Sequence, residues 1–337
     1  MSVIKPQLKQ PNRLIDRFNR AHTYLRISVT DRCNLRCQYC MPPEGIEWKE
    51  RRELLSFEEI LRVARVFVAM GIDKIRLTGG EPLARKNLDM LIEQLAGLDG
   101  LNTIAMTTNG ILLSDQVSRL KEAGLSALNI SLDTLRPERF QQISKRDYFH
   151  QAMAGIEAAL NEGFDSIKLN VVVMAGVNED EILDFVRFVE DKPINVRFIE
   201  YMPFKNNAWS QGDVYPFLSM KRQIESRYEL RPVAPEFGAV AKDFVLPGYL
   251  GTVSFITSMT DSFCATCNRL RLTADGQIKS CLFHPAEVNI RDTMRTGISD
   301  FELETLIESA VLQKQEAHPP MEELLNVENR AMIEIGG

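Results

Sequence analysis

The sequence lacks the marks of several large protein classes. No apolar run is long enough to span a bilayer, and no apolar core follows the scattered basic residues near the start, so neither a membrane span nor a secretory signal is expected. The net charge of −6 disfavours a broad basic surface for nucleic acid. We therefore expect a cytoplasmic protein that binds neither membrane nor nucleic acid.

Two common nucleotide-binding loops are also absent. Neither G-x-x-x-x-G-K-[ST] nor G-x-G-x-x-G occurs anywhere in the 337 residues. Any bound phosphates would have to be held by side chains. Histidine is scarce as well: of the four, His22, His150 and His318 are isolated, and surface or packing roles are expected for them.

The six cysteines form two groups of three, with none between the groups. They are Cys33, Cys37 and Cys40 near the start, and Cys264, Cys267 and Cys281 near the end. A disulfide framework does not need two tight triplets, and the cytosol keeps thiols reduced. The cysteines therefore predict two metal centres.

The first triplet has the spacing C-x3-C-x2-C, which lets one loop wrap three thiolates around one centre. A structural metal site usually closes with four protein ligands, whereas three leave one position open. On a cubane iron–sulfur cluster that position is an iron free to bind a small molecule. The alternatives are half a structural zinc site or buried apolar cysteines. The additional cysteine at position 33, upstream of the Cys37/Cys40 pair, favours the cluster.

Strand and helix patterns alternate between residues 24 and 200. Strands are predicted at 24–30, 74–78, 103–107, 127–132, 167–173 and 195–200. Helices are predicted at about 56–70, 86–97, 114–123, 136–162 (broken) and 179–190, with capping pairs Ser56/Glu59 and Asn178/Glu181. Six β/α units predict the α/β class: an incomplete (β/α)6 TIM-like barrel, open on one side.

The predicted division is a poorly ordered lead-in at 1–20, the partial barrel at 21–203 and an α+β extension at 204–337 that covers the open side. In the extension, helices are expected at 217–228 and 299–313. A hairpin that turns at Asp275–Gly276 returns Cys281 to the side of Cys264 and Cys267. The alternative for this triplet is a structural zinc site completed by His284.

One face of nearly every predicted barrel strand is polar. Because the apolar face must meet the helices, the polar face is expected to point into the barrel. The lumen would then gather Arg26, Lys74, Arg76, Lys168 and Arg197. Buried cations are costly unless an anion is bound. The alternatives are that Asp133 and Glu200 neutralise these cations or that some of them lie at the barrel mouth in water, but two acids against five bases favour a polyanionic small ligand.

Two motifs resemble known families. The first triplet with Tyr39 before its last cysteine, followed by Gly79-Gly80-Glu81-Pro82, resembles the radical S-adenosylmethionine (SAM) superfamily. The stretch FCATCNRLRLTADGQIKSCLF and the ending MIEIGG resemble the GTP 3′,8-cyclase family. The resemblance runs from about residue 20 to the end and is weakest between 203 and 255. It implies a lyase that converts GTP to 3′,8-cyclo-7,8-dihydro-GTP, the first step of molybdenum cofactor biosynthesis.

The resemblance also implies two 4Fe–4S clusters, with SAM on the cluster of the first triplet and GTP facing the cluster of the second. SAM would contact Tyr39, Gly80, Ser131 and Met202. GTP would contact Arg26, Arg76, Thr107, Lys168, Arg269, Leu270 and Arg271. The Gly336–Gly337 tail would enter the site, the alternative being a frayed terminus.

The partners implied are a one-electron reductant of flavodoxin or ferredoxin type, a second copy in a homodimer, and a functional link to cyclic pyranopterin monophosphate synthase. Two other functions remain open from the residues. One is a radical SAM enzyme that modifies a peptide. The other is a zinc-stapled α/β protein that binds an anionic metabolite without catalysis.

Overall fold

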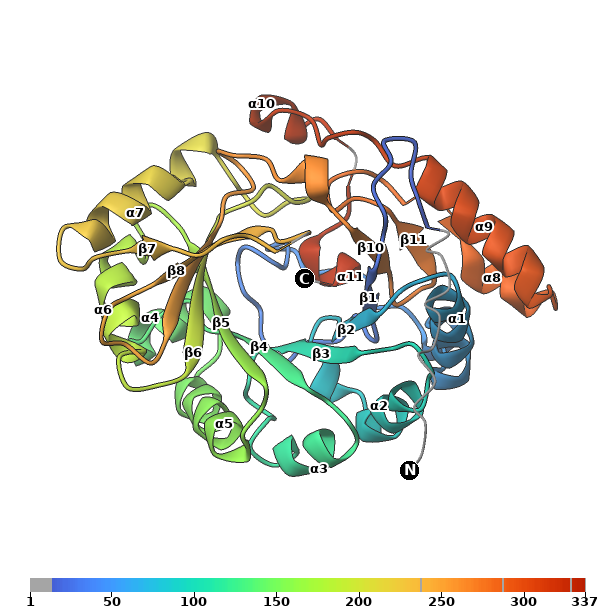
Figure 1. Ribbon diagram of the computed structural model, residues 1–337, viewed down its shortest axis with the longest axis horizontal. Helices are drawn as coiled ribbons and strands as arrows, with labels where there is room; N and C mark the ends of the chain where they lie inside the picture. Colours follow the sequence, from blue (N-terminus) through green and yellow to red (C-terminus); the bar gives the residue numbers. More distant parts are fainter. Residues whose placement is uncertain (1–13, 237, 287, 328, 337) are drawn as a thin grey trace, which may run out of the picture.

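The computed structural model describes residues 14–236, 238–286, 288–327 and 329–336. Its strands form one sheet in the order β12-β11-β10-β1-β2-β3-β4-β5-β6-β9-β8-β7. The sheet curls into a partial barrel with helices on its outside (Figure 1). No helix of the described residues is both long and apolar enough to cross a membrane.

The predicted β/α units are confirmed. The strands are β1 (Tyr24–Ser28), β2 (Lys74–Thr78), β3 (Thr103–Thr108), β4 (Ala127–Ser131), β5 (Ser166–Val173) and β6 (Ile194–Glu200). The helices are α1 (Phe57–Ala69), α2 (Leu88–Ala96), α3 (Val117–Glu122), α4 (Pro137–Ser144), α5 (Phe149–Glu162) and α6 (Ile182–Phe188). The expected break in 136–162 separates α4 from α5, and the Ser56/Glu59 capping box begins α1.

The rest of the chain extends both edges of the same sheet. Its strands are β7 (Arg231–Pro232), β8 (Ala241–Val245), β9 (Thr252–Ile256), β10 (Arg269–Leu272), β11 (Gln277–Lys279) and β12 (Val288–Asn289). Its helices are α7 (Phe217–Glu225), α8 (Ile290–Arg295), α9 (Asp300–Leu312), α10 (Met321–Leu324) and α11 (Met332–Ile335). β9 pairs parallel to β6, and β10 pairs parallel to β1, so each edge gains a parallel strand. Helix α11 lies inside the ring (Figure 1).

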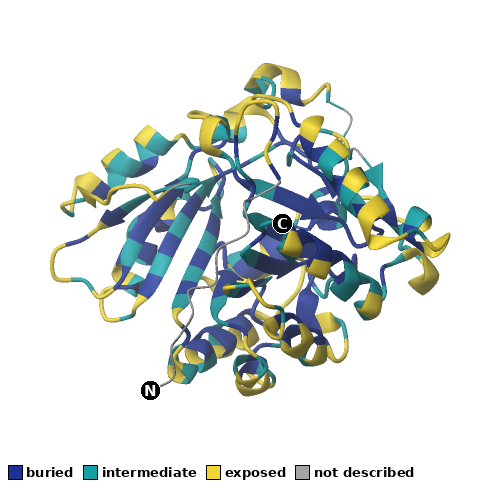
Figure 2. Ribbon diagram, turned by 45° about the vertical axis from the view of Figure 1, so that its right-hand side comes forward, coloured by how far each residue is buried: buried dark blue, intermediate teal, exposed yellow. Residues whose placement is uncertain are grey.

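Alternation along the strands sorts the side chains between core and lumen. Leu25 and Ile27 on β1 are fully buried against the helices, as are Ile75 and Leu77 on β2. The residues between them lie on the other face and are less buried along several strands (Figure 2). A one-residue slip would exchange the two faces, so the burial of the apolar set fixes the register.

Two local predictions were wrong. Residues 14–20 of the predicted lead-in pack against the rest of the protein: Leu14 is fully buried, and Arg20 donates from Nε to Asp16 (2.6 Å). Residues 1–13 lie outside the described part. Asn178 and Glu181 do not form a capping pair. Asn178 instead donates to the carbonyls of Asp133 and Val172, while Glu181 accepts from Thr134 and the Leu135 amide.

Candidate functional site

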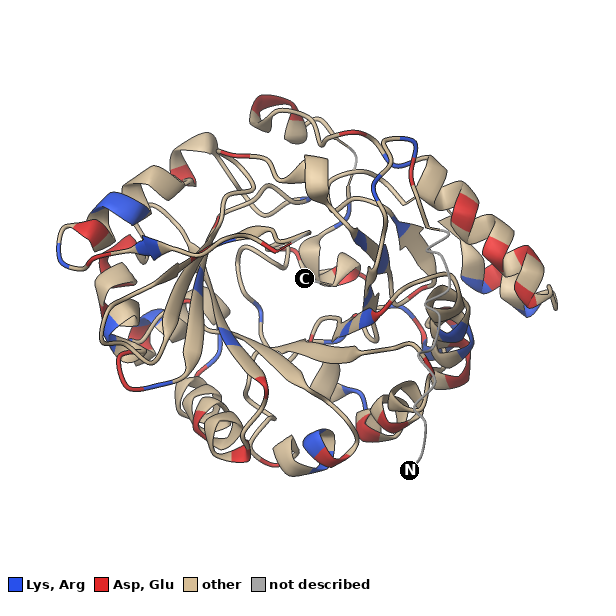
Figure 3. Ribbon diagram, viewed as in Figure 1, with Lys and Arg blue, Asp and Glu red and all other residues tan. Residues whose placement is uncertain are grey.

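A cavity of about 630 Å³ lies in the barrel lumen. It is lined by the predicted lumen cations and by the second cysteine triplet. Figure 3 shows basic residues on several of the ring's strands. The cations that line it are Arg20, Arg26, Lys74, Arg76, Lys168, Arg197, Arg269, Arg271 and Lys314, while the acids are Asp73, Glu236, Asp243 and Glu316. The described lining therefore carries an excess of positive charge.

Strand register places three arginines in one row. Arg26 on β1 pairs with Arg271 on β10 and with Arg76 on β2. Arg271 and Arg76 are only 7% and 5% exposed. Like charges directly opposite one another across strands are destabilising, so this row is expected to bind an anion.

Several buried polar atoms of the lumen have no partner within the described protein. They include Arg197 Nε, Arg269 Nη2, Thr107 Oγ1 and Asn170 Oδ1. A buried donor without an acceptor carries a free-energy cost of about 1–3 kcal/mol. A ligand rich in oxygen atoms would satisfy the two arginine donors.

The expected counter-charges do not reach these arginines. Asp133 accepts from the Tyr39 hydroxyl (2.7 Å) and the Val172 amide (2.9 Å). Glu200 accepts from the amides of Phe217, Met259 and Thr260. The neutralisation alternative is therefore wrong for both acids, because backbone amides and hydroxyls occupy them.

The lumen charges perturb one another's protonation. Burial, with a smaller effect from Arg197, lowers the pKa of Lys168 to about 8. Burial alone would raise the pKa of the Tyr24 phenol, but Arg76, Arg26 and Lys74 outweigh it and lower that pKa to about 7. Arg76 donates from Nε to the Tyr24 hydroxyl. The Tyr24 shift arises from neighbouring positive charge, and that of Lys168 mainly from burial; a bound anion would raise both pKa values.

The second cysteine triplet lies beside the lumen cations. β10 and β11 form the predicted hairpin, with Gly276 at φ +80°, and Cys281 follows it. Lys314 is 3% exposed, and its Nζ lies 3.5 Å from Cys267 Sγ and 3.0 Å from the Arg269 carbonyl oxygen. Burial raises the pKa of the Cys267 thiol, but Lys314 and Arg269 outweigh it and lower that pKa to about 7. Lys314 and Arg269 therefore favour the thiolate form of Cys267, which is the form that binds metal.

Arg20, near the N-terminus, contacts the loop that carries Cys264. Arg20 donates from Nη1 to the carbonyls of Cys264 (2.8 Å) and Glu316 (2.6 Å), and from Nη2 to that of Gln315 (2.7 Å). Asp16 holds this guanidinium in place. The start of the described chain thus fixes the loop that carries Cys264.

The described geometry shows neither a zinc site completed by His284 nor an assembled three-thiolate site at either cysteine triplet. No three His, Cys, Asp or Glu side chains of the described residues are grouped so that they could hold a metal ion. The His284 Nε2 atom lies 3.4 Å from the Ala317 carbonyl oxygen. All six cysteines are free thiols of intermediate exposure.

The first triplet occupies the loop after β1. The Leu35 amide donates to Cys33 Sγ (3.4 Å), and Asn109 Nδ2 lies 3.9 Å from the same sulfur. Burial raises the pKa of the Cys33 thiol to about 11, and it also raises the pKa values of Cys37 and Cys40 well above their usual range. Without a metal these thiols are neutral, and a bound cation would deprotonate them.

Gly79 and Gly80 allow the turn after β2 to approach this loop. A Cβ atom at Gly80 would lie 2.4 Å from the Arg32 carbonyl oxygen, and one at Gly79 would lie 2.6 Å from that of Thr30. The Glu81 amide donates to the Arg32 carbonyl (2.7 Å). The glycines therefore bring the backbone of the second β/α turn against the cysteine loop.

One apolar cluster joins residues of the two cysteine regions. Tyr39 and Met202 pack against it together with Cys281 and Met332. The Ile333 amide donates to the Cys40 carbonyl (3.4 Å), and Arg271 donates to the Gly336 carbonyl (3.2 Å). The C-terminal segment thus contacts both regions, although Gly337 lies outside the described residues.

Not every residue that was predicted to bind SAM or GTP lines the cavity. Arg26, Arg76, Lys168, Arg269, Arg271 and Met202 line it. Thr107 and Ser131 are in register with lining residues Asn129 and Asn170. The Leu270 side chain is fully buried in the apolar core, because alternation on β10 points it away from Arg269 and Arg271. Its predicted contact with GTP therefore stays a prediction for its backbone atoms.

The sequence reasoning missed three residues of the site. Tyr24 precedes Arg26 by two positions, so the alternation of β1 was a sufficient signal for it. Asp243 raises the pKa values of Lys168 and Arg197, against the lowering by burial. Asp243 and Lys314 lie far from the motifs in the sequence, and no local pattern marks either of them.

Two family profiles match adjacent parts of the chain. The Radical SAM superfamily matches residues 27–189, and Molybdenum Cofactor Synthesis C matches residues 194–320. Together they cover the barrel and most of the extension.

Curated relatives match nearly the whole chain. The mitochondrial GTP 3′,8-cyclase of Arabidopsis thaliana is 50% identical over 325 residues, which are 96% of this chain and 83% of that protein. The GTP 3′,8-cyclase of Moorella thermoacetica is 45% identical over 96% of this chain and 99% of its own length. Molybdenum cofactor biosynthesis protein 1 of Homo sapiens is 50% identical, but the chain spans only 50% of its length.

Among solved structures, Streptococcus suis SuiB bound to S-adenosylmethionine superposes with a TM-score of 0.58 at 15% identity. The match covers 83% of this chain and 66% of SuiB. At this identity the match supports the fold alone.

Proposed function

Because the chain belongs to the GTP 3′,8-cyclase family of radical SAM enzymes, we propose that it converts GTP to 3′,8-cyclo-7,8-dihydro-GTP, the first step of molybdenum cofactor biosynthesis. Membership of the radical SAM superfamily implies SAM and a 4Fe–4S cluster. The observation that carries the proposal is the row of lumen arginines beside the second cysteine triplet.

Cys33, Cys37 and Cys40 would hold the cluster that binds SAM. When reduced, this pair of cofactors supplies a 5′-deoxyadenosyl radical. The backbone at Tyr39 and Gly80 would line the SAM site, where the contact between the Gly80 turn and the cysteine loop leaves no room for a side chain. Ser131 and Met202 complete the proposed SAM contacts.

The lumen residues would hold GTP. Arg26, Arg76, Lys168, Arg269 and Arg271 would bind its triphosphate, and Thr107 would contribute the hydroxyl that now lacks a partner. Cys264, Cys267 and Cys281 would hold a second 4Fe–4S cluster that faces the guanine. With base and phosphates both fixed, the ribose is positioned and water is excluded, as a reactive radical requires.

The partners follow from this chemistry. Each SAM cleavage consumes one electron, so the proposal includes a reductant of flavodoxin or ferredoxin type. The product would pass to cyclic pyranopterin monophosphate synthase, and a homodimer is proposed for the assembly. A peptide substrate is disfavoured because an ordinary peptide lacks the dense negative charge that would match the cationic row.

The experiment has two parts. Anaerobic incubation with GTP, SAM and dithionite is expected to yield 5′-deoxyadenosine and a cyclised nucleotide by mass spectrometry. Calorimetry is expected to show GTP binding that the Arg269→Ala/Arg271→Ala variant loses. Unchanged GTP affinity in that variant, or a purified protein that contains zinc and no iron, would contradict the proposal.

A further inference from the structure

A second cavity, of about 950 Å³, adjoins the first cysteine loop. It is lined by Thr30 and Arg32, which precede the cysteines, by Lys49, Arg51, Arg52 and residues 54–58, by the turn at 84–87 and by Arg295. Among the side chains that line it, Glu58 is the one acid. The cations, besides Arg295, are Arg32, Lys49, Arg51, Arg52, Arg85 and Lys86, and we call this cavity the basic groove.

The cations of the basic groove face solvent, unlike those of the lumen. The Arg32 side chain is 51% exposed, and Arg51, Arg52 and Lys86 are also exposed. Arg51 and Lys86 form no ion pair with another residue of the described ranges. Other cations of the groove do form ion pairs: Arg32 with Asp31, Lys49 with Asp275, Arg52 with Glu50 and Arg295 with Glu59. The Arg85 side chain is held in place by three contacts. It donates to the carbonyls of Val29 and Leu55, and its guanidinium lies 4.1 Å from the Phe57 ring centroid.

The groove is continuous with the cysteine loop. Arg32 directly precedes Cys33, and its guanidinium lies 5.1 Å from the Trp48 ring centroid. Trp48 packs against an apolar cluster together with Cys33 and Cys40. The aromatic ring that contacts Arg32 therefore packs against the same apolar cluster as two thiols of the first triplet.

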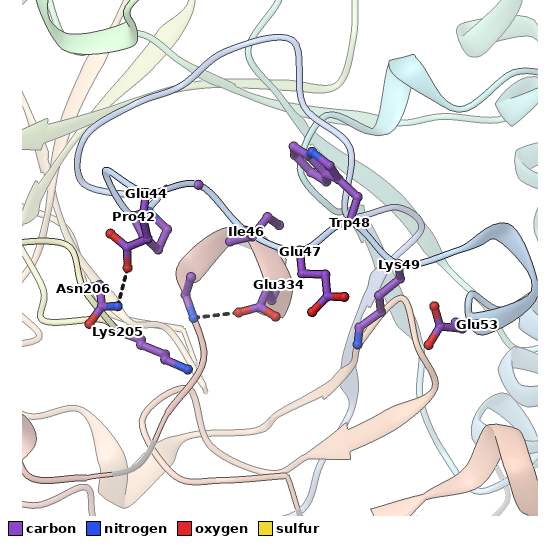
Figure 4. A pocket seen from close by; sticks show the side chains of 12 residues that line it. Pro42, Glu44, Ile46, Glu47, Trp48, Lys49, Glu53, Lys205, Asn206 and Glu334 are labelled. Carbon is purple, nitrogen blue, oxygen red and sulfur yellow. Dashed lines mark hydrogen bonds between the residues drawn. The ribbon is translucent and has the colours of Figure 1, made fainter.

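The neighbouring pocket carries more acidic than basic side chains. It measures about 410 Å³ and is lined by Glu44, Glu47, Glu53 and Glu334 as well as by Lys49 and Lys205 (Figure 4). Glu44 accepts from Asn206 (2.5 Å), and Glu334 accepts from the Ala331 amide (3.1 Å). An acidic partner that approaches the cysteine loop is therefore attracted to the basic groove and repelled by this pocket.

We propose that the basic groove docks a small acidic electron-transfer protein, which gives up one electron to the cluster of the first triplet. This inference rests on the proposed function, in which that electron then breaks a carbon–sulfur bond of SAM. The donor is oxidised by one electron, and the cluster is reduced by one. No described residue that lines the basic groove also lines the lumen cavity, so donor and substrate would use separate cavities.

A protein fits the groove better than a small anion does. A small anion is held by buried, converging donors, as in the lumen, whereas the cations here are spread over an open rim. Exposed charges contribute little affinity each, but together they accelerate the encounter of oppositely charged proteins and make it sensitive to salt.

The test is stopped-flow reduction of the reconstituted protein by reduced flavodoxin, followed by bleaching of the cluster absorbance. For Arg51→Glu/Lys86→Glu we expect the second-order rate constant to fall at least ~10-fold at low ionic strength and to approach the wild-type value at high salt. The affinity for oxidised flavodoxin, measured by calorimetry, should fall in parallel. Reduction by dithionite should be unchanged, because dithionite needs no docking site.

The matched control is Arg65→Glu/Arg119→Glu, which reverses two exposed charges on α1 and α3. It should keep the wild-type rate with flavodoxin. An unchanged rate in the groove variant, or an equal loss in the control, would overturn the docking proposal. Stoichiometric binding of inorganic triphosphate that the groove variant loses would also overturn it, since it would assign the groove to a small anion. Failure of the proposed function is separate: dithionite would then reduce the cluster without producing 5′-deoxyadenosine.

Discussion

Arg26 on β1 lies directly opposite Arg271 on β10, in the same register as Arg76 on its other side. Burial lowers the pKa of Arg26 well below its usual range, and Arg271 and Arg76 lower it further. A ligand-free protein thus keeps three cations together at the expense of its own stability. Such a cost is typical of a site built for its ligand.

Replacing Arg26 with methionine should therefore act in opposite directions on stability and binding. The free energy of unfolding of the ligand-free protein should rise by about 1–2 kcal/mol, because a buried like-charge contact is removed. The affinity for GTP should fall ~10- to 100-fold. Urea unfolding and calorimetry measure the two effects. Arg65→Met, at an exposed position of the outer helix α1, is the matched control and should change neither.

GTP binding should be accompanied by proton uptake. The pKa of Lys168 is lowered to about 8 and that of Tyr24 to about 7, and a bound polyanion would raise both. At pH 8 each group is then partly deprotonated in the free protein and gains protons on binding, so affinity should fall as pH rises through 8. Calorimetry in HEPES and in Tris measures the uptake from the difference in binding enthalpy. Equal enthalpies in the two buffers would contradict the prediction, and Lys168→Met should reduce the difference.

Gly80→Ala should move the turn that follows β2 away from the first cysteine loop. The added methyl group would lie 2.4 Å from the Arg32 carbonyl oxygen, so the backbone must shift. We expect a loss of about 2–4 kcal/mol of unfolding free energy and a lower iron content after reconstitution. Gly97→Ala is the matched control, because its nearest contact would be an ordinary 3.5 Å. Equal behaviour of the two variants would show that the close approach is unimportant.

Lys314→Met should alter the second centre without altering the first. The ammonium group lies 3.5 Å from Cys267 Sγ, and positive charge beside a cluster ligand stabilises the reduced state. The midpoint potential of the second cluster should become more negative, on the order of tens of millivolts. Redox titration followed by electron paramagnetic resonance measures both clusters in one sample. A shift confined to the first cluster, or no shift, would count against a direct effect of Lys314.

Local pattern determined the six β/α units, the face of each strand and the hairpin that carries Cys281. These features follow from the two-residue period of a strand and from turn residues such as Gly276, so they can be read from neighbours in the chain. The row formed by Arg26 and Arg76 belongs to this class, because alternation alone points both into the lumen.

Only the tertiary structure decided which distant segments meet at the site. It placed β10 beside β1, which completes the row with Arg271, and it brought Lys314 and Arg20 to the second cysteine loop. It also assigned Asp133 and Glu200 to backbone amides rather than to the cations. Such contacts depend on how the chain closes over long separations, and no short-range periodicity encodes them.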